Sequence, residues 1–217
     1  MRVVFGADGL APAIVQDRLT GEVRMLGWVD AAALEATARS GRMTFYSRSR
    51  KRLWEKGETS GNALRVARLA ADCDGDAVLA EVDPAGPTCH TGASSCFFRP
   101  LDAAEAGDGG AAPAPYLVEL ERVIEARKAA AEGTSYTRDL IAKGPAKIGE
   151  KLREEADELA RAIAGESDAR VASEAADVLF HLMVGLASRG LSLRDAVAAL
   201  AARAGVSGHT EKAHRRG

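Results

Sequence analysis

The stretch KIGEKLREEADELARAI, residues 147–163, decides the fold of the second half of the chain. Placed at about 100° per residue, its large apolar side chains fall within about 60° of one another. Its charged side chains share a neighbouring arc of about 100°. The apolar set is Ile148, Leu152, Leu159 and Ile163, and the charged set is Lys147, Lys151, Glu154, Glu155 and Glu158. The spacing therefore predicts an amphipathic helix with a core stripe beside a charged face.

A second helix of the same kind is predicted through Glu174, Asp177 and His181, which share one arc beside an apolar stripe. The turn at residues 164–168 is short, so the two helices are expected to be antiparallel neighbours. Their carboxylates would repel one another unless cations neutralised them, and oxygen ligands suit Mg²⁺. The predicted magnesium ligands are Glu154, Glu155, Glu158, Glu174 and Asp177.

One other interpretation of these helices applies to the same residues. For either helix alone, a solvated face with i,i+4 ion pairs is the more common explanation of such charges. Matched acidic faces on two consecutive helices favour the metal site. Lys147 and Lys151 are expected to hold phosphate oxygens at its mouth, and His181 is expected to pack in the bundle or to support a ligand rather than to bind the metal.

Working outward, residues 102–115, DAAEAGDGGAAPAP, contain no large apolar residue and are predicted to be a linker between domains 1–101 and 116–217. Apolar residues recur at helical spacing again from Leu117, and Ser192 with Asp195 forms a predicted capping box that begins a last helix. The second domain is therefore expected to be an all-α helical bundle.

The first domain has a different pattern, in which β-branched and aromatic residues alternate with Gly, Asp and Pro. Strands are predicted at 23–29, 43–50, 63–70 and 77–84, and a short helix at 30–39 begins with the capping residue Asp30. This combination predicts an α+β domain with an antiparallel sheet.

Composition excludes some classes of function. With 29 basic and 31 acidic residues, the net charge of −2 argues against a broad surface for nucleic acid or anionic membrane. The sequence predicts neither a secretion signal nor a membrane-spanning run, so the protein is expected to be cytoplasmic. Its three cysteines do not suggest a disulfide framework.

The cysteines lie close to acidic residues in the first domain. Asp72, Asp74 and Asp76 surround Cys73 at a predicted hairpin turn, and Cys89, His90 and Cys96 follow. Carboxylates suit Mg²⁺ and thiolates suit Zn²⁺, so two unlike metals are expected here. Three thiolates leave a fourth zinc position for water, which His90 is placed to orient or deprotonate. Taken singly, free cysteines are often only small buried hydrophobes.

The segment 46–62 is rich in basic and hydroxyl side chains and is predicted to bind a phosphorylated, aromatic ligand. A solvated basic loop beside a core tryptophan is the alternative. The predicted binding residues are Arg48, Arg50, Arg52, Trp54, Lys56, Thr59, Ser60 and Asn62.

Four motifs of the first domain, LGWVDAAAL, FYSRSRKRLWEKGETSGN, DCDGDA and GPTCHTGASSCFFR, together resemble phosphoribosyl-AMP cyclohydrolase of histidine biosynthesis over residues 20–100. The resemblance implies a homodimer whose zinc thiolates are shared between partners at the subunit interface. It implies zinc at Cys73, Cys89 and Cys96, magnesium at the three aspartates, and a catalytic His90. The implied reaction is attack of zinc-activated water on C6 of the adenine ring, followed by opening of the N1–C6 bond.

The second domain resembles phosphoribosyl-ATP pyrophosphatase, an all-α nucleotide pyrophosphohydrolase, through SYTRDL, KIGEKLREEADELA and SEAADVLFHLMVGL. The resemblance covers residues 116–204 and implies release of pyrophosphate from phosphoribosyl-ATP by water, with Mg²⁺ holding the polyphosphate. The two implied reactions are consecutive, so each resemblance supports the other. The rival interpretations are a general nucleoside triphosphate pyrophosphatase with a structural zinc module, and a metal-stabilised interaction protein without catalysis.

Overall fold

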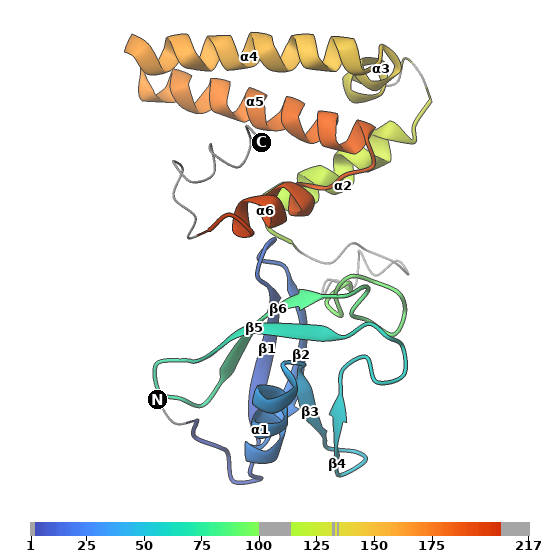
Figure 1. Ribbon diagram of the computed structural model, residues 1–217, viewed down its shortest axis with the longest axis vertical. Coiled ribbons are helices and arrows are strands. Elements are labelled where there is room, and N and C mark those ends of the chain that lie inside the picture. The colour runs from blue at the N-terminus through green and yellow to red at the C-terminus, as the bar shows by residue number, and fades with distance from the viewer. Residues whose placement is uncertain (1–2, 100–113, 132, 134, 205–217) are drawn as a thin grey trace, which may run out of the picture. The chain divides into compact units, whose positions relative to one another are not determined.

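The computed structural model (Figure 1) describes residues 3–99, 114–131, 133 and 135–204, which form two compact units that divide between Pro115 and Tyr116. Residues 102–113 of the predicted linker, and the tail 205–217, lie outside the described residues.

The first unit contains two sheets and one helix. The larger sheet has the strand order β2-β1-β6-β5, in which β1 pairs antiparallel with β2 and β5 pairs antiparallel with β6. The pairing of β1 with β6 is parallel, which the sequence analysis did not anticipate. The smaller sheet pairs β3 with β4 antiparallel. The elements are β1 Ala11–Asp17, β2 Val23–Val29, α1 Ala31–Ser40, β3 Thr44–Ser47, β4 Arg52–Glu55, β5 Leu64–Ala71 and β6 Val78–Pro84. The α+β prediction is confirmed.

Strand β1 was missing from the predicted strands although it lies inside the sheet. Its inward side chains at positions 11, 13 and 15 are Ala, Ala and Val, which are fully buried but small, so the period-2 signal is weak. Pro12 also argues against a central strand. The structure accommodates Pro12 because it is the second residue of β1 and the parallel ladder to β6 starts only at Ala13.

The helix predicted at 30–39 is confirmed as α1, since the Asp30 carboxylate accepts a hydrogen bond from the Ala33 amide at 2.7 Å. The predicted strand 43–50 is shorter than expected, because the chain turns after Ser47 and returns as β4. Part of the predicted basic loop is therefore strand, and the Trp54 ring stacks on Phe45 with centroids 5.2 Å apart.

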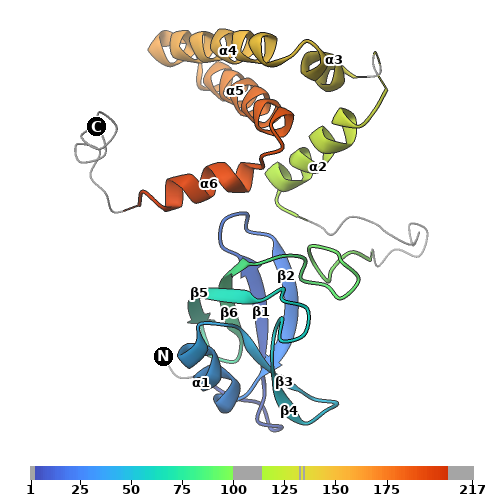
Figure 2. The same cartoon turned by 45° about the vertical axis from the view of Figure 1, so that its right-hand side comes forward.

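The second unit is a helical bundle, as predicted. Helices α4 and α5 are joined by a short turn and pack side by side (Figures 1 and 2). Helix α6 begins with the predicted capping box of Ser192 and Asp195. The helices are α2 Tyr116–Lys128, α3 Tyr136–Ala142, α4 Pro145–Gly165, α5 Asp168–Ser188 and α6 Leu193–Ala201.

The apolar core of this unit lies at one end of α4. Ile148 is buried there with Ile124 of α2, Leu140 of α3 and Val184 of α5. Ile163, predicted to belong to the core stripe, is 66% exposed. That prediction was wrong, because periodicity identifies a face of a helix but not how far along it the neighbouring helices extend.

Helix α5 is long and apolar enough by length and composition to cross a membrane, which the sequence analysis did not anticipate. It packs along α4, however, and carries the buried polar side chains of Glu174 and His181. These features are those of the central helix of a bundle.

Candidate functional site

The loop at residues 88–96 brings two of the three cysteines together. Within it, the Cys89 amide donates to the Ala93 carbonyl at 3.0 Å, and Gly92 turns the chain with a φ of 90°. Cys89 and Cys96 line one pocket of about 380 Å³, and His90 lines it too, with Nδ1 3.8 Å from the Cys89 sulfur.

The two thiols of this pocket differ in acidity. Burial opposes ionisation of Cys89, but hydrogen bonds from Thr91 and from the Cys96 thiol outweigh it and lower its pKa. Burial, together with the neighbouring Cys89 charge, raises the pKa of Cys96 to about 11. Cys89 therefore loses its proton more readily than Cys96, and a cation bound between the two sulfurs would favour the thiolate form of both. Two adjacent sulfurs beside an imidazole fit zinc as a partial ligand set.

Cys73 lies at the opposite end of the β5–β6 hairpin from this pocket. It follows Ala71, which pairs with Val78, whereas Cys89 follows Pro84, which pairs with Leu64. Within the described part of one chain, the three thiols therefore do not meet.

The predicted aspartate cluster is brought together at this hairpin turn. Oxygens of Asp72, Asp74 and Asp76 lie within 4.8 Å of one another. A hydrogen bond from the Ala77 amide lowers the pKa of Asp72. The charges of Asp74 and Asp72 raise the pKa of Asp76. Three exposed carboxylates so close together fit a hydrated divalent cation such as Mg²⁺.

The predicted ligand-binding residues divide into two groups. Trp54, Lys56, Ser60 and Asn62 line the pocket that contains Cys89. The others do not line this pocket: Arg48 stacks its guanidinium 4.5 Å from the Trp28 ring, and Arg50, Arg52 and Thr59 are exposed elsewhere. Gly86 was not among the predicted site residues. A β-carbon at this position would lie only 2.5 Å from the Asn62 side-chain oxygen. Gly86 permits the close approach that holds Asn62 in the pocket wall.

The second candidate site lies between α4 and α5. Oxygens of Glu155, Glu158 and Glu174 lie within 4.8 Å of one another. Burial raises the pKa of Glu174, the Arg170 charge opposes this, and the charges of Glu158 and Asp177 add to it. A cluster of partly buried carboxylates, in which the pKa of Glu174 is raised, fits a divalent cation. Of the other two predicted ligands, Asp177 is exposed near Glu174, and Glu154 is exposed and pairs with Lys151.

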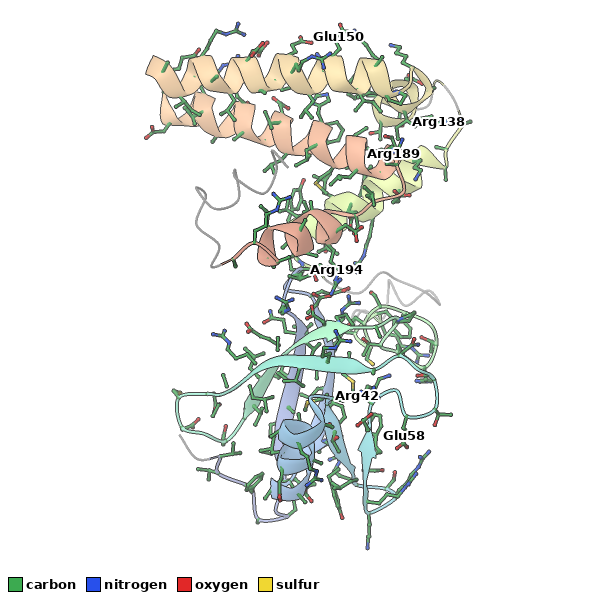
Figure 3. All side chains as sticks on the ribbon, in the orientation of Figure 1. Arg42, Glu58, Arg138, Glu150, Arg189 and Arg194 are labelled. Carbon is green, nitrogen blue, oxygen red and sulfur yellow. The ribbon has the colours of Figure 1, made fainter. Side chains whose placement is uncertain are left out.

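Cationic side chains surround the cluster. The Lys151 ammonium lies 3.4 Å from Glu155 and 2.7 Å from Glu154. Lys147 pairs with Glu150 at 2.6 Å, and Glu150 projects from the side of α4 turned away from α5 (Figure 3). Sequence reasoning missed Arg170, whose guanidinium lies 2.6 Å from Glu174 and 3.8 Å from Glu158. Its i,i+4 spacing to Glu174 is the signal that could have identified it.

His181 takes the packing position predicted for it. Its Nδ1 lies 2.9 Å from the Asp177 carbonyl, which can only accept, so Nδ1 carries the proton. The Nε2 atom lies 3.0 Å from the Tyr136 hydroxyl, and it accepts a hydrogen bond from this group when the ring is neutral. The ring is buried, with Nδ1 3.8 Å from Glu155. Tyr136 of the motif SYTRDL was not among the predicted site residues, yet it connects α3 to the carboxylate cluster.

Comparison with known proteins agrees with this division into two sites. The phosphoribosyl-AMP cyclohydrolase family matches residues 25–98, and the phosphoribosyl-ATP pyrophosphohydrolase family matches residues 117–204. The histidine biosynthesis bifunctional protein HisIE of Shewanella oneidensis is 44% identical over 196 residues, covering 90% of this chain and 88% of that protein. Its namesake from Escherichia coli K12 is 45% identical over 186 residues, covering 86% and 87%. The chain therefore belongs to the family of histidine biosynthesis bifunctional proteins, with a cyclohydrolase domain before a pyrophosphohydrolase domain.

Proposed function

We propose that the chain catalyses two consecutive hydrolyses in histidine biosynthesis, each at its own metal site. The helical unit releases pyrophosphate from phosphoribosyl-ATP, and the α+β unit opens the adenine ring of the phosphoribosyl-AMP that results. The observation that carries this proposal is the pair of unlike ligand clusters, one in each unit, each inside the segment that matches the corresponding family. A cytoplasmic location is consistent with substrates that are soluble nucleotides.

For the ring-opening site, we propose zinc at Cys89 and Cys96 of one subunit and Cys73 of a second copy. The support is geometric, because Cys89 and Cys96 share a pocket while Cys73 lies at the other end of the hairpin. Zinc supplies a water of lowered pKa. His90 lies beside Cys89 and is placed to accept the proton of the attacking water. Trp54 and Asn62 in the pocket wall bind and orient the nucleotide.

Two further magnesium sites belong to the proposal. The aspartates at positions 72, 74 and 76 hold one ion at the hairpin, and Glu155, Glu158 and Glu174, assisted by Asp177 and Glu154, hold ions between α4 and α5. Between α4 and α5, Glu155, Glu158 and Glu174 would hold magnesium, which when bound would neutralise the charge of phosphate oxygens. Lys151 can exchange its contacts with Glu154 and Glu155 for a phosphate oxygen, and Lys147 would have to leave Glu150 to do the same.

The test of function supplies phosphoribosyl-ATP with Mg²⁺ and Zn²⁺ and follows both pyrophosphate and the ring-opened product. Cys89→Ser should stop ring opening while pyrophosphate release continues. Glu155→Gln should stop pyrophosphate release yet retain ring opening when phosphoribosyl-AMP is supplied. Loss of both activities from either change would contradict separate sites, and faster turnover of ordinary dNTPs than of phosphoribosyl-ATP would favour a general pyrophosphatase.

The shared zinc site is tested by mixing two inactive variants, Cys73→Ser and Cys89→Ser. If subunits exchange at random, half of the dimers are mixed, and each mixed dimer has one complete site out of two, so about a quarter of wild-type ring opening should return. The control mixes Cys89→Ser with Cys96→Ser, which places both changes on the same side of the site and should restore nothing. Equal recovery in both mixtures, or none in either, would contradict the shared site.

A further inference from the structure

Two acidic residues and one arginine are buried on the β1–β2 hairpin, and none of them is a proposed metal ligand. Asp17, Glu22 and Arg24 are 0%, 3% and 8% exposed. One terminal nitrogen of Arg24 lies 2.8 Å from Asp17, and the other lies 3.0 Å from Glu22. Buried ion pairs of this kind add little net stability compared with apolar residues of the same size. Their presence in a small sheet therefore calls for another explanation.

The same three residues hold the loop that carries the pocket cysteines. Arg24 donates from its NH1 nitrogen to the Ser94 carbonyl at 3.0 Å, and the Ser94 hydroxyl donates to Glu22 at 3.0 Å. The backbone of β2 adds two contacts, because the Val23 carbonyl accepts from the Ser95 hydroxyl at 2.7 Å and the Arg24 carbonyl accepts from the Cys96 amide at 2.8 Å. Cys96 is thus fixed to β2 directly, and the residues before it are fixed through the charged network.

The network reaches Cys89 as well. The Ser94 carbonyl that accepts from Arg24 also accepts from the amide of Thr88, at 3.4 Å, and the Cys89 amide bonds to Ala93. The start of the loop at Thr88 is therefore hydrogen-bonded to Ser94 near its end, and the same Ser94 carbonyl accepts from the Arg24 guanidinium. A planar guanidinium can contact two carboxylates and a carbonyl at once, whereas a lysine ammonium on a flexible stem cannot hold the same geometry.

We propose that Arg24, held between Asp17 and Glu22, is a positioning residue that fixes Cys89 relative to Cys96 and so sets the zinc affinity of the ring-opening site. This inference rests on the zinc site proposed above. Outer contacts that orient metal ligands commonly change metal affinity by roughly 10–100-fold when they are removed. Arg24 contacts none of the proposed substrate-binding residues through its side chain, so its effect passes through the loop.

The experiment compares Arg24→Lys with wild type in the full chain. The substitution keeps the buried charge balance but loses the planar contacts. Zinc alone is titrated against a chromophoric chelator, and the visible spectrum of the Co²⁺-substituted protein reports thiolate geometry. We expect the zinc Kd to rise roughly 10-fold or more, the cobalt spectrum to change, and ring opening to recover partly with excess zinc. Pyrophosphate release, which belongs to the other unit, should be unchanged and gives the concentration of active protein in each sample.

Two further variants separate positioning from a loss of stability. Ser94→Ala removes one connection between the network and the loop without unbalancing the charge, and should raise the zinc Kd by a smaller factor than Arg24→Lys. Val29→Ala truncates a fully buried side chain at the other end of β2, and should lower thermal stability while leaving the zinc Kd and the cobalt spectrum unchanged.

The outcomes are distinct. A wild-type zinc Kd and cobalt spectrum in Arg24→Lys would overturn the inference, as would an equal rise in the Kd of Val29→Ala. If Arg24→Lys does not fold, a wild-type Kd in Ser94→Ala overturns it and a raised Kd supports it. If the wild-type protein itself binds no zinc through its thiols, the proposed function of this site fails first, and the positioning role fails with it.

Discussion

Removing the guanidinium of Arg170 should tighten magnesium binding by the helical unit. Arg170 contacts Glu174 at 2.6 Å and Glu158 at 3.8 Å, and both carboxylates belong to the cluster proposed to hold Mg²⁺. Without a metal ion, the positive charge of Arg170 offsets the repulsion between the carboxylates of Glu174 and Glu158. A magnesium ion that binds Glu174 must displace this contact or share the carboxylate with it. Arg170→Ala removes that competition.

The size of the effect follows from burial. Arg170 is 52% exposed, so solvent screens its charge, and exposed ion pairs contribute about 0.2–1 kcal/mol. Only 3% of the Glu174 side chain is exposed, so we place the contribution of this ion pair at the upper end of that range, about 1 kcal/mol. A cost of about 1 kcal/mol corresponds to about a fivefold change in affinity. We therefore expect the magnesium Kd of Arg170→Ala to fall about fivefold.

The assay is calorimetric titration of metal-free protein with Mg²⁺, together with the magnesium dependence of pyrophosphate release. The matched control is Arg161→Ala, because Arg161 lies 3.8 Å from Glu158 but is not paired with Glu174. Its effect should stay below about twofold, as for other exposed pairs. An unchanged or higher Kd in Arg170→Ala would refute the reasoning, as would an equal decrease in the control. An unchanged Kd with a raised KM for phosphoribosyl-ATP would assign Arg170 to the substrate instead.

Three other substitutions test separate parts of the structure. Tyr136→Phe removes the donor that orients His181 beside the carboxylate cluster, and should raise the magnesium concentration needed for pyrophosphate release roughly 10-fold while ring opening is unchanged. Gly86→Ala should displace Asn62 and lower kcat/KM for ring opening by up to about 100-fold, with pyrophosphate release as the internal control. Hydrogen bonds from the backbone and side chain of Ser192 lower the pKa of Asp195, so its contribution to stability is present above pH 3.8 and is lost as the pH falls through the lowered value. Asp195→Asn should therefore lower the melting temperature at pH 7, and the difference from wild type should narrow below pH 3.8; a constant difference would contradict this assignment.

The sequence was most informative where a local pattern decides the structure. The capping residues Asp30 and Ser192 begin their helices as predicted, because a cap depends on backbone amides only two or three residues away. The opposed acidic faces of α4 and α5 followed from helical periodicity and a short turn. Strand β1 was missed because its burial comes from pairing with β2 on one side and β6 on the other, which its short side chains do not reveal.

Long-range contacts account for the remaining gaps. Nothing in the local sequence indicates that Arg24 contacts the Ser94 carbonyl, since the two residues are 70 positions apart. Tyr136 and His181 are likewise 45 positions apart. The predicted binding segment 46–62 contributes Lys56 and Asn62 to the wall of the pocket, but Arg50 and Arg52, which follow the turn after Ser47, do not line it. Spacing along the chain cannot give that result, because it depends on how β3 and β4 pair.

The two acidic clusters differ in how the metal-free chain tolerates them. Asp72, Asp74 and Asp76 are exposed, and within the described residues none of them forms an ion pair, so water and backbone amides separate their charges. Glu155 and Glu174 are buried, so water does not screen the repulsion between their charges. The positive charges of Lys151 and Arg170 offset it instead. If the buried cluster holds magnesium as proposed, protein cations and magnesium would compete there for the same oxygens. Removing magnesium should cost the hairpin little stability, whereas the helical unit should depend on Arg170 most strongly when the metal is absent.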